Sequence, residues 1–167
     1  MTNSLASTDV AVVHSGYANY RRQLLRMGVT LYEMSKDLSR EEQQQVKGEP
    51  FYEPQSSLHA KAMVIDRSTL FIGSLNLDPR SVVQNTEIGI VFESEEIADH
   101  IALFFSTIVP AIAFRLELRT DENGFEHIVW HGMVDGENKT LLWEPQTTFW
   151  ERFSMNLLRL LPVESQL

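Results

Sequence analysis

The chain has 167 residues and no cysteine, which excludes disulfides, thiolate metal ligands and a cysteine nucleophile. Its hydrophobic content of 43% is enough for one buried core, and its length suggests one domain. The formal net charge of -9 disfavours nucleic acid as a partner, because such partners are bound mainly by clustered Lys and Arg. Histidine is therefore the candidate for any nucleophilic chemistry.

The first part of the chain predicts a helix followed by a strand, as in an α/β fold. The helix is expected from Ser15 or Gly16 through Met27, with Gly28 ending it, and the strand is expected over Val29–Met34. The predicted apolar face of this helix contains Tyr17, Tyr20, Leu24 and Met27, and the arginines largely off it are Arg21, Arg22 and Arg26. Ser35–Ser57 reads as a polar excursion.

The stretch LHAKAMVIDRSTLFIGSLN, from Leu58 to Asn76, predicts a β-hairpin whose strands join near Asp66–Thr69. Side chains alternate along a strand, so His59 and Lys61 share one face. A turn centred on Arg67-Ser68 would set His59 opposite Asn76 and Lys61 opposite Ser74.

Two interpretations of these polar residues compete. Taken alone, His59 would be a satisfied core histidine and Lys61 a lysine that discourages edge-strand pairing. Packing explains less well why four groups that can hold an oxyanion converge beside a glycine that permits close approach. The four are His59, Lys61, Ser74 and Asn76, and the glycine is Gly73.

The remainder predicts alternating strands and helices. The expected elements are the strand Glu87–Phe92, a core helix from about Ser94 to Val109, strands at Phe114–Arg119 and Phe125–Trp130 around a turn at Asp121–Gly124, a turn at Asp135-Gly136 before Thr140–Trp143, and a helix over Thr147–Leu161. The apolar window Ile101–Phe114 is interrupted by Pro110 and is too short to span a bilayer.

Two weaker patterns concern the last part of the chain. Trp150, Phe153, Leu157, Leu160 and Leu161 recur at helical spacing, which core packing explains more readily than a helix at a membrane interface. His127 and His131 could suggest a metal pair, but no third ligand follows from the sequence, so they are interpreted as structural or exposed.

The residues His59-x-Lys61, Asp66 and Gly73-Ser74-x-Asn76 resemble, without a gap, the HKD signature of the phospholipase D superfamily. Leu77–Ser81, LDPRS, is similar to the segment that follows this motif in bacterial cardiolipin synthases. The resemblance extends to Thr2–Leu25 and to Glu144–Phe153, so it covers nearly the whole chain. It implies an α/β fold, a phospholipase D-like α/β/α sandwich with a mixed central sheet.

The resemblance also implies roles for single residues. One motif histidine forms a phosphohistidine while a second motif's histidine protonates the leaving group, without a metal or other cofactor. Lys61, Ser74 and Asn76 would bind phosphate, Glu87 would orient His59, and Asp66 would support the motif. Whether His59 is the nucleophile or the general acid is left open.

The chain has one motif, and its flanking segments resemble the C-terminal half of bacterial cardiolipin synthases with two motifs. The resemblance thus implies that residues 1–167 are a single catalytic domain and the C-terminal half of such an enzyme. The start MTNSLASTDV has no secretory signal pattern and suggests an excised piece. The implied partners are phosphatidylglycerol, with phosphatidylethanolamine as a further candidate, an N-terminal HKD half or a homodimer mate, and the cytoplasmic surface of the bacterial inner membrane.

Phosphatidyl transfer that makes cardiolipin is therefore the leading hypothesis. A single-motif phosphodiesterase or endonuclease that completes its site by homodimerising is the alternative, and the net charge counts against it. A non-catalytic binding module of the same fold is the third, although binding alone does not require the whole motif.

Overall fold

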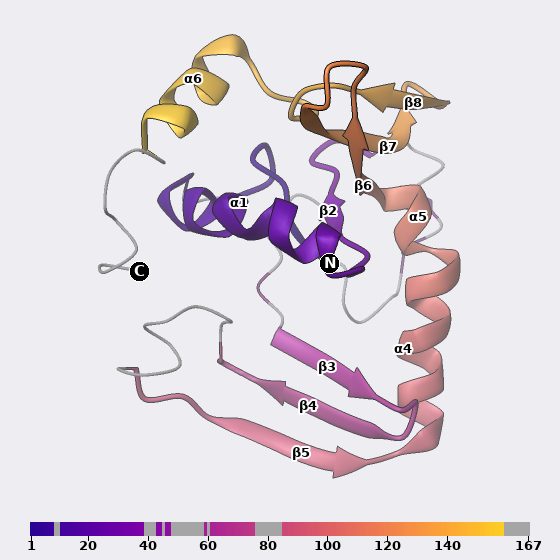
Figure 1. Cartoon of the computed structure of the whole chain (residues 1–167). Helices are drawn as coiled ribbons and strands as arrows, with labels where there is room; N and C mark the ends of the chain where they lie inside the picture. Colours follow the sequence, from indigo (N-terminus) through magenta and orange to yellow (C-terminus); the bar gives the residue numbers. More distant parts are fainter. Residues whose placement is uncertain are drawn as a thin grey trace.

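A computed structural model describes residues 1–8, 11–38, 43–44, 46–47, 59, 61–75 and 85–158. These residues form two β-sheets, and a long helix, α4, runs from one sheet towards the other (Figure 1). The described elements are β1 (Thr2–Asn3), α1 (Ala11–Arg26), β2 (Tyr32–Met34), β3 (Lys61–Ile65), β4 (Thr69–Gly73), β5 (Gly89–Glu93), α4 (Glu95–Thr107), α5 (Val109–Ile112), β6 (Ala113–Thr120), β7 (Glu126–Val134), β8 (Glu137–Leu141) and α6 (Phe149–Leu158).

The larger sheet is mixed and has five strands in the order β1-β2-β6-β7-β8. β1 is parallel to β2, and the other neighbours are antiparallel. The hairpin β6–β7 follows the predicted turn: the Asp121 carboxylate accepts hydrogen bonds from the backbone N–H groups of Asn123 and Phe125, each 2.9 Å long, and Gly124 adopts a φ of 83°. The predicted α/β class with a mixed sheet is confirmed.

The helix α1 packs against β6 and α6. It begins at Ala11, earlier than expected, and ends as expected near Gly28, whose φ of 84° suits glycine. Its predicted apolar face is wrong in part, because Tyr20 and Met27 are exposed whereas Arg21 is 2% exposed.

The smaller sheet has three antiparallel strands in the order β3-β4-β5, so the motif hairpin and the following strand form a sheet of their own in the described part of the chain. The described residues thus contain a second, smaller sheet besides the predicted mixed one. One face packs on α4, where Leu70, Ala98 and Ile101 form a buried cluster. The Ser94 side chain caps α4 by accepting from the N–H of Ile97 at 3.3 Å, and α4 begins close to the predicted start at about Ser94.

α6 begins with a capping box formed by Thr148 and Glu151. The N–H and hydroxyl of Thr148 donate to the Glu151 carboxylate, and the N–H of Glu151 donates to the Thr148 hydroxyl oxygen. Met155 is buried with Leu5 and Ala18. The predicted core packing of the other apolar residues is wrong for this chain, since Trp150, Phe153 and Leu157 are exposed; Leu160 and Leu161 lie outside the described residues. None of the helices in the described ranges is long and apolar enough to cross a membrane.

Candidate active site

The motif residues lie at one end of the three-stranded sheet. His59 precedes β3 and Lys61 opens it, while Ser74 follows β4 and Glu87 precedes β5. Because β3 and β5 both run antiparallel to β4, these positions meet at the same end, opposite the Asp66–Ser68 turn (Figure 1). His59 is exposed and Lys61 is half-buried.

The register of the hairpin differs from the prediction. Lys61 pairs with Gly73 rather than with Ser74, and the same register carried outward would set His59 opposite Leu75 rather than Asn76. Ser74, one residue beyond Gly73, therefore lies on the opposite face of the hairpin from Lys61. Asn76 itself lies outside the described residues.

The turn explains this shift. Asp66 and Arg67 adopt positive φ values of 51° and 54°, and the N–H of Ser68 donates to the carbonyl of Ile65 at 3.1 Å. These are the features of a type I′ turn with Asp66 and Arg67 at its centre. Ser68 is an additional loop residue, so the strand pair next to the turn is Ile65 with Thr69. Asp66 is thus placed far from the motif end of the sheet, which supports a structural role for it.

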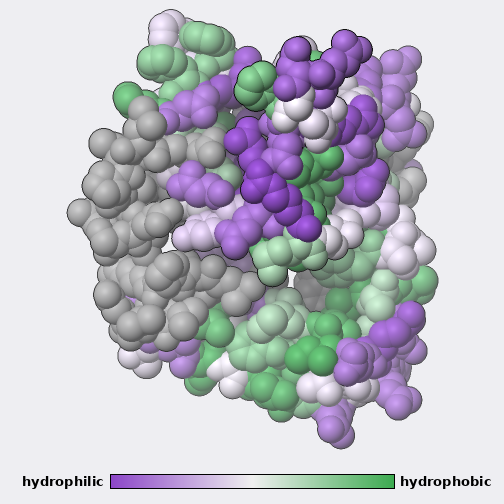
Figure 2. Space-filling model, in the orientation of Figure 1, coloured by the Kyte–Doolittle hydropathy of each residue, from purple (hydrophilic) through white to green (hydrophobic). Residues whose placement is uncertain are grey.

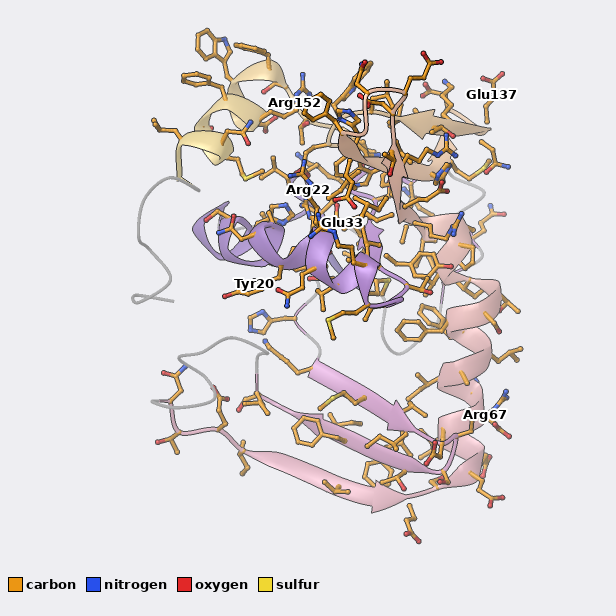
Figure 3. The ribbon with its side chains drawn as sticks, viewed as in Figure 1. Tyr20, Arg22, Glu33, Arg67, Glu137 and Arg152 are labelled. Carbon is orange, nitrogen blue, oxygen red and sulfur yellow. The ribbon has the colours of Figure 1, made fainter. Side chains whose placement is uncertain are left out.

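The turn is also fixed to the neighbouring helix. The guanidinium of Arg67 donates to the carboxylate of Asp99 on α4 at 2.7 Å (Figure 3). Both side chains are mostly exposed, so this pair contributes little stability, about 0–1 kcal/mol. It orients the far end of the hairpin.

Ser74 joins β4 to β5 at the motif end. Its N–H donates to the carbonyl of Ile88 at 2.9 Å, its hydroxyl oxygen accepts from the N–H of Ile88 at 3.1 Å, and its hydroxyl donates to Glu87 at 2.5 Å. The structure thereby brings two predicted site residues, Ser74 and Glu87, into direct contact. The predicted contact between Glu87 and His59 stays a prediction.

Gly73 allows the strands to approach closely beside Lys61. A Cβ at this position would lie 2.6 Å from the carbonyl oxygen of Ile88 and 2.8 Å from the ring of Phe71. At Gly89, its partner on β5, a Cβ would lie 2.3 Å from the same ring. The Phe71 ring therefore covers both glycines, on the sheet face that Lys61 also occupies.

A second polar cluster, buried in the larger part of the molecule, was missed by sequence reasoning. Arg21 of α1 contacts Glu33 of β2 at 2.8 Å and Glu144, in the segment after β8, at 2.6 Å. Glu33 also accepts from the indole N–H of Trp130 at 2.9 Å, and His14 contacts both Arg21 and Glu144. Figure 3 shows Glu33 between α1 and the sheet.

Burial and pairing act in opposite directions on these carboxyl groups. Burial raises the pKa of Glu33, although Arg21 opposes the shift. For Glu144, burial alone would raise the pKa, but the hydrogen bond from His14 and the charge of Arg21 outweigh it and lower the pKa to about 2. Glu144 is therefore charged at neutral pH, and the cluster ties the segment before α6 to α1.

A different helical stripe would have revealed this cluster. His14, Tyr17, Ala18, Arg21 and Leu25 recur at the spacing of one helix face. The apolar face predicted from the sequence contains instead the more apolar Tyr20, Leu24 and Met27. A histidine and an arginine within an inward-facing stripe signal buried partners, here the two glutamates.

The two histidines of β7 each have an acidic neighbour. His127 lies 3.0 Å from Asp121, and His131 lies 3.0 Å from Glu117 and 2.9 Å from the hydroxyl of Thr140. These contacts agree with their interpretation as structural or exposed residues. No group of three metal-binding side chains was found among the described positions.

The mixed sheet and its helices form an α/β fold of the phospholipase D-like kind, with His59 and Lys61 at the start of β3. Residues 1–109 match the family described as "Cardiolipin synthase, PLD-like domain", and the chain belongs to this family.

Curated relatives support the assignment. The chain is 44% identical over 98% of its length to Cardiolipin synthase C of Escherichia coli, and 32% identical over 97% to an uncharacterized protein of Helicobacter pylori. It spans 34% and 30% of these relatives. It is also 36% identical over 46% of its length to the DISARM protein DrmC of Bacillus paralicheniformis, spanning 27% of that protein. No solved structure matches the chain significantly.

Proposed function

We propose that the chain supplies one HKD half-site of an enzyme that transfers a phosphatidyl group between phospholipids and thereby forms cardiolipin. The observation that carries this proposal is the convergence of His59, Lys61, Ser74 and Glu87 at one end of the small sheet. The identity of 44% with Cardiolipin synthase C supports the choice of a lipid substrate.

In the proposed reaction, an imidazole nitrogen attacks phosphorus and a nitrogen–phosphorus bond forms while the bond to the leaving alkoxide breaks. A second imidazole donates a proton to that alkoxide. A headgroup hydroxyl of another phospholipid then gives its proton to the second imidazole, attacks phosphorus and displaces the first. His59 is one of the two imidazoles, and the reaction requires no metal or other cofactor.

The remaining motif residues act on charge and orientation. The Lys61 ammonium and the Asn76 amide donate to the phosphoryl oxygens, whose negative charge grows in the transition state. Glu87 accepts from one ring nitrogen of His59, which turns the other nitrogen towards phosphorus. The Ser74 hydroxyl donates to Glu87 at 2.5 Å and so holds that carboxylate, while the predicted binding of phosphate by Ser74 stays a prediction.

The second half-site comes from an N-terminal HKD half of the same polypeptide. The small sheet offers a surface for it on the face that Lys61 occupies, where the apolar side chains of Met63, Ile65 and Val91 are exposed. The reaction takes place with the protein bound peripherally at the cytoplasmic face of the membrane, where phosphatidylglycerol and phosphatidylethanolamine are available.

A homodimeric phosphodiesterase or endonuclease is the alternative, favoured by the single motif in this chain. The net charge of -9 counts against a nucleic-acid substrate. A non-catalytic module is the third hypothesis, and the complete set of motif residues counts against it.

Product analysis separates the three. The protein is incubated with phosphatidylglycerol, with and without phosphatidylethanolamine, and in parallel with DNA. Cardiolipin supports the proposal, cleaved DNA supports the alternative, and the absence of both products from the intact polypeptide supports a binding module.

A further inference from the structure

α6 has apolar side chains on two opposite sides. Successive residues of a helix are turned by about 100°, which places Met155 towards α1 and four other apolar residues on the opposite side. This outer face of α6 consists of Phe149, Trp150, Phe153 and Leu157, which are 64%, 72%, 53% and 55% exposed. Figure 2 shows hydrophobic residues gathered over this corner of the molecule, where Figure 1 places α6.

The aromatic rings of the outer face form one cluster. Phe149 stacks on Phe153 with centroids 6.3 Å apart, and Trp150 contacts both rings edge-on at 5.4 and 6.1 Å. The rings therefore contact each other and leave their outer surfaces to solvent. A preformed cluster of this kind loses little side-chain entropy when it binds.

The charged residues of α6 are directed away from this face. The Glu151 carboxylate accepts from the N–H and hydroxyl of Thr148 at the helix start. The Arg152 guanidinium donates to the carbonyl of Thr147 at 2.6 Å. The outer face is consequently uncharged although the whole chain is strongly acidic.

The size of the face argues for lipid rather than protein as its partner. From their exposed fractions, the four side chains present roughly 500 Å² to solvent, since a buried aromatic side chain contributes about 150–250 Å². Stable protein interfaces bury about 800 Å² on each partner. Insertion of Trp and Phe into a headgroup boundary has no such threshold.

The segment before α6 holds the helix in this orientation. Glu144 is bound to Arg21, and the Gln146 side chain accepts from the N–H of Lys36 at 2.8 Å and donates to Ser35 at 2.9 Å. Two anchors thus attach the segment to α1 and to the end of β2. The outer face of α6 is thereby held towards solvent.

We infer that the outer face of α6 is the part of this chain that inserts into the boundary layer of a phospholipid bilayer. This inference rests on the proposed function, because a phosphatidyl transferase must reach lipids held in a membrane. The binding is driven by apolar burial and not by attraction between charges, since the chain carries a net charge of -9 and the face carries none.

Vesicle flotation tests this inference without measuring activity. The chain is mixed with vesicles of phosphatidylcholine alone and of phosphatidylcholine with phosphatidylglycerol, at low and at high salt. We expect binding to both compositions with little effect of salt. The double variant Trp150→Ser, Phe153→Ser should lower the partition coefficient about tenfold or more. This change corresponds to losing a modest part of the free energy gained by burying two aromatic side chains.

Matched controls use exposed apolar residues elsewhere, namely Trp143→Ser and Val91→Ser, whose side chains are 56% and 68% exposed. Each should change binding by less than about twofold, because single exposed apolar groups are ordinary. Absent binding, or equal losses in a control and in the α6 variant, overturns the inference. Binding only to phosphatidylglycerol vesicles, unaffected by the α6 variant, also overturns it while leaving the proposed function intact. Conversely, vesicle binding with no cardiolipin formed even after an N-terminal HKD half is added would sink the proposed function alone.

Discussion

The small sheet and the buried ionic cluster use charged residues in opposite ways. In the small sheet, His59 and the Asp66 turn are exposed, and apolar residues such as Ile90 are left partly in solvent. In the larger part of the molecule, Arg21 and Glu33 are almost completely enclosed and pair with each other. The first region leaves groups available for a substrate or a partner, whereas the second satisfies its charges internally.

The difference shows that burial of a charge is not by itself a sign of function. A strongly shifted pKa often marks an active site, yet the shifted carboxyl groups here, Glu33 and Glu144, join α1, β2 and the segment before α6. The candidate catalytic residues His59 and Lys61 are instead exposed and half-buried. Substitutions in the two regions should therefore separate activity from stability.

The largest effect is expected from His59→Ala. The variant should lose all measurable transfer in the intact enzyme, because loss of proton transfer alone is worth about a hundredfold or more. Its unfolding free energy should stay within about 0.5 kcal/mol of wild type, since the side chain is exposed. Lys61→Ala should behave similarly, measured by cardiolipin formation and urea unfolding.

Asp66→Asn is the matched control for His59→Ala, because Asp66 lies in the turn at the other end of the hairpin. Asn tolerates a positive φ, so the variant should fold and keep most of its activity. A tenth of wild-type activity left in His59→Ala would contradict a direct chemical role.

Arg21→Met should produce the largest loss of stability. The substitution leaves Glu33 and Glu144 buried without their cation, which costs on the order of 3–5 kcal/mol. Arg22→Met, at the exposed neighbouring position of the same helix, should cost less than about 0.5 kcal/mol. Equal urea midpoints for the two variants would show that the cluster does not stabilise the fold.

Glu144→Gln should cost less than Arg21→Met, on the order of 2–3 kcal/mol at neutral pH, because Arg21 keeps Glu33 as a partner. The pKa of Glu144 is lowered from 4.5 to about 2, so its stabilising effect is complete above pH 4.5 and is lost as the pH falls to about 2.

The difference in unfolding free energy between wild type and Glu144→Gln should therefore shrink across that interval. Chemical denaturation at a series of pH values measures it. Glu137→Gln, at a side chain that is 76% exposed, serves as the control. A constant difference between wild type and Glu144→Gln would mean that Glu144 does not titrate in this range.

The smallest effects concern the glycines of the small sheet. Gly73→Ala places a Cβ against the backbone carbonyl of Ile88 and should cost about 1–3 kcal/mol. Gly89→Ala meets only the Phe71 side chain, which can move, and should cost less. Thermal unfolding of the two variants compares them, and a larger cost for Gly89→Ala would indicate that Phe71 is fixed.

Local sequence patterns predicted most of the elements, because turn and cap residues act over a few positions. The Asp121–Gly124 turn, the start of α4 near Ser94 and the stop of α1 near Gly28 are examples. Of the motif residues, Lys61 and Ser74 lie at one end of the small sheet, whereas Asp66 lies in the turn at the other end. The hairpin register was wrong because the pattern could not distinguish a turn on Arg67-Ser68 from one on Asp66-Arg67 with an added residue.

The buried cluster and α6 depend on contacts between distant parts of the chain. Arg21 and Glu144 are brought together by the packing of α1, and nothing near either residue specifies the other. For α6, an apolar stripe predicts a helix but does not say which side is covered. Met155 faces α1 while Trp150 faces solvent, and periodicity alone gives no reason for that choice.

The central claim, that this chain supplies one of two half-sites, is tested most directly by cardiolipin formation from phosphatidylglycerol. The assay compares the isolated chain with the chain mixed with an N-terminal HKD half, while sedimentation records the oligomeric state. We predict that the isolated chain is folded and inactive as a monomer, and that the added half restores transfer. Full activity from a proven monomer would contradict the two-half account, and activity only from a homodimer would favour the alternative.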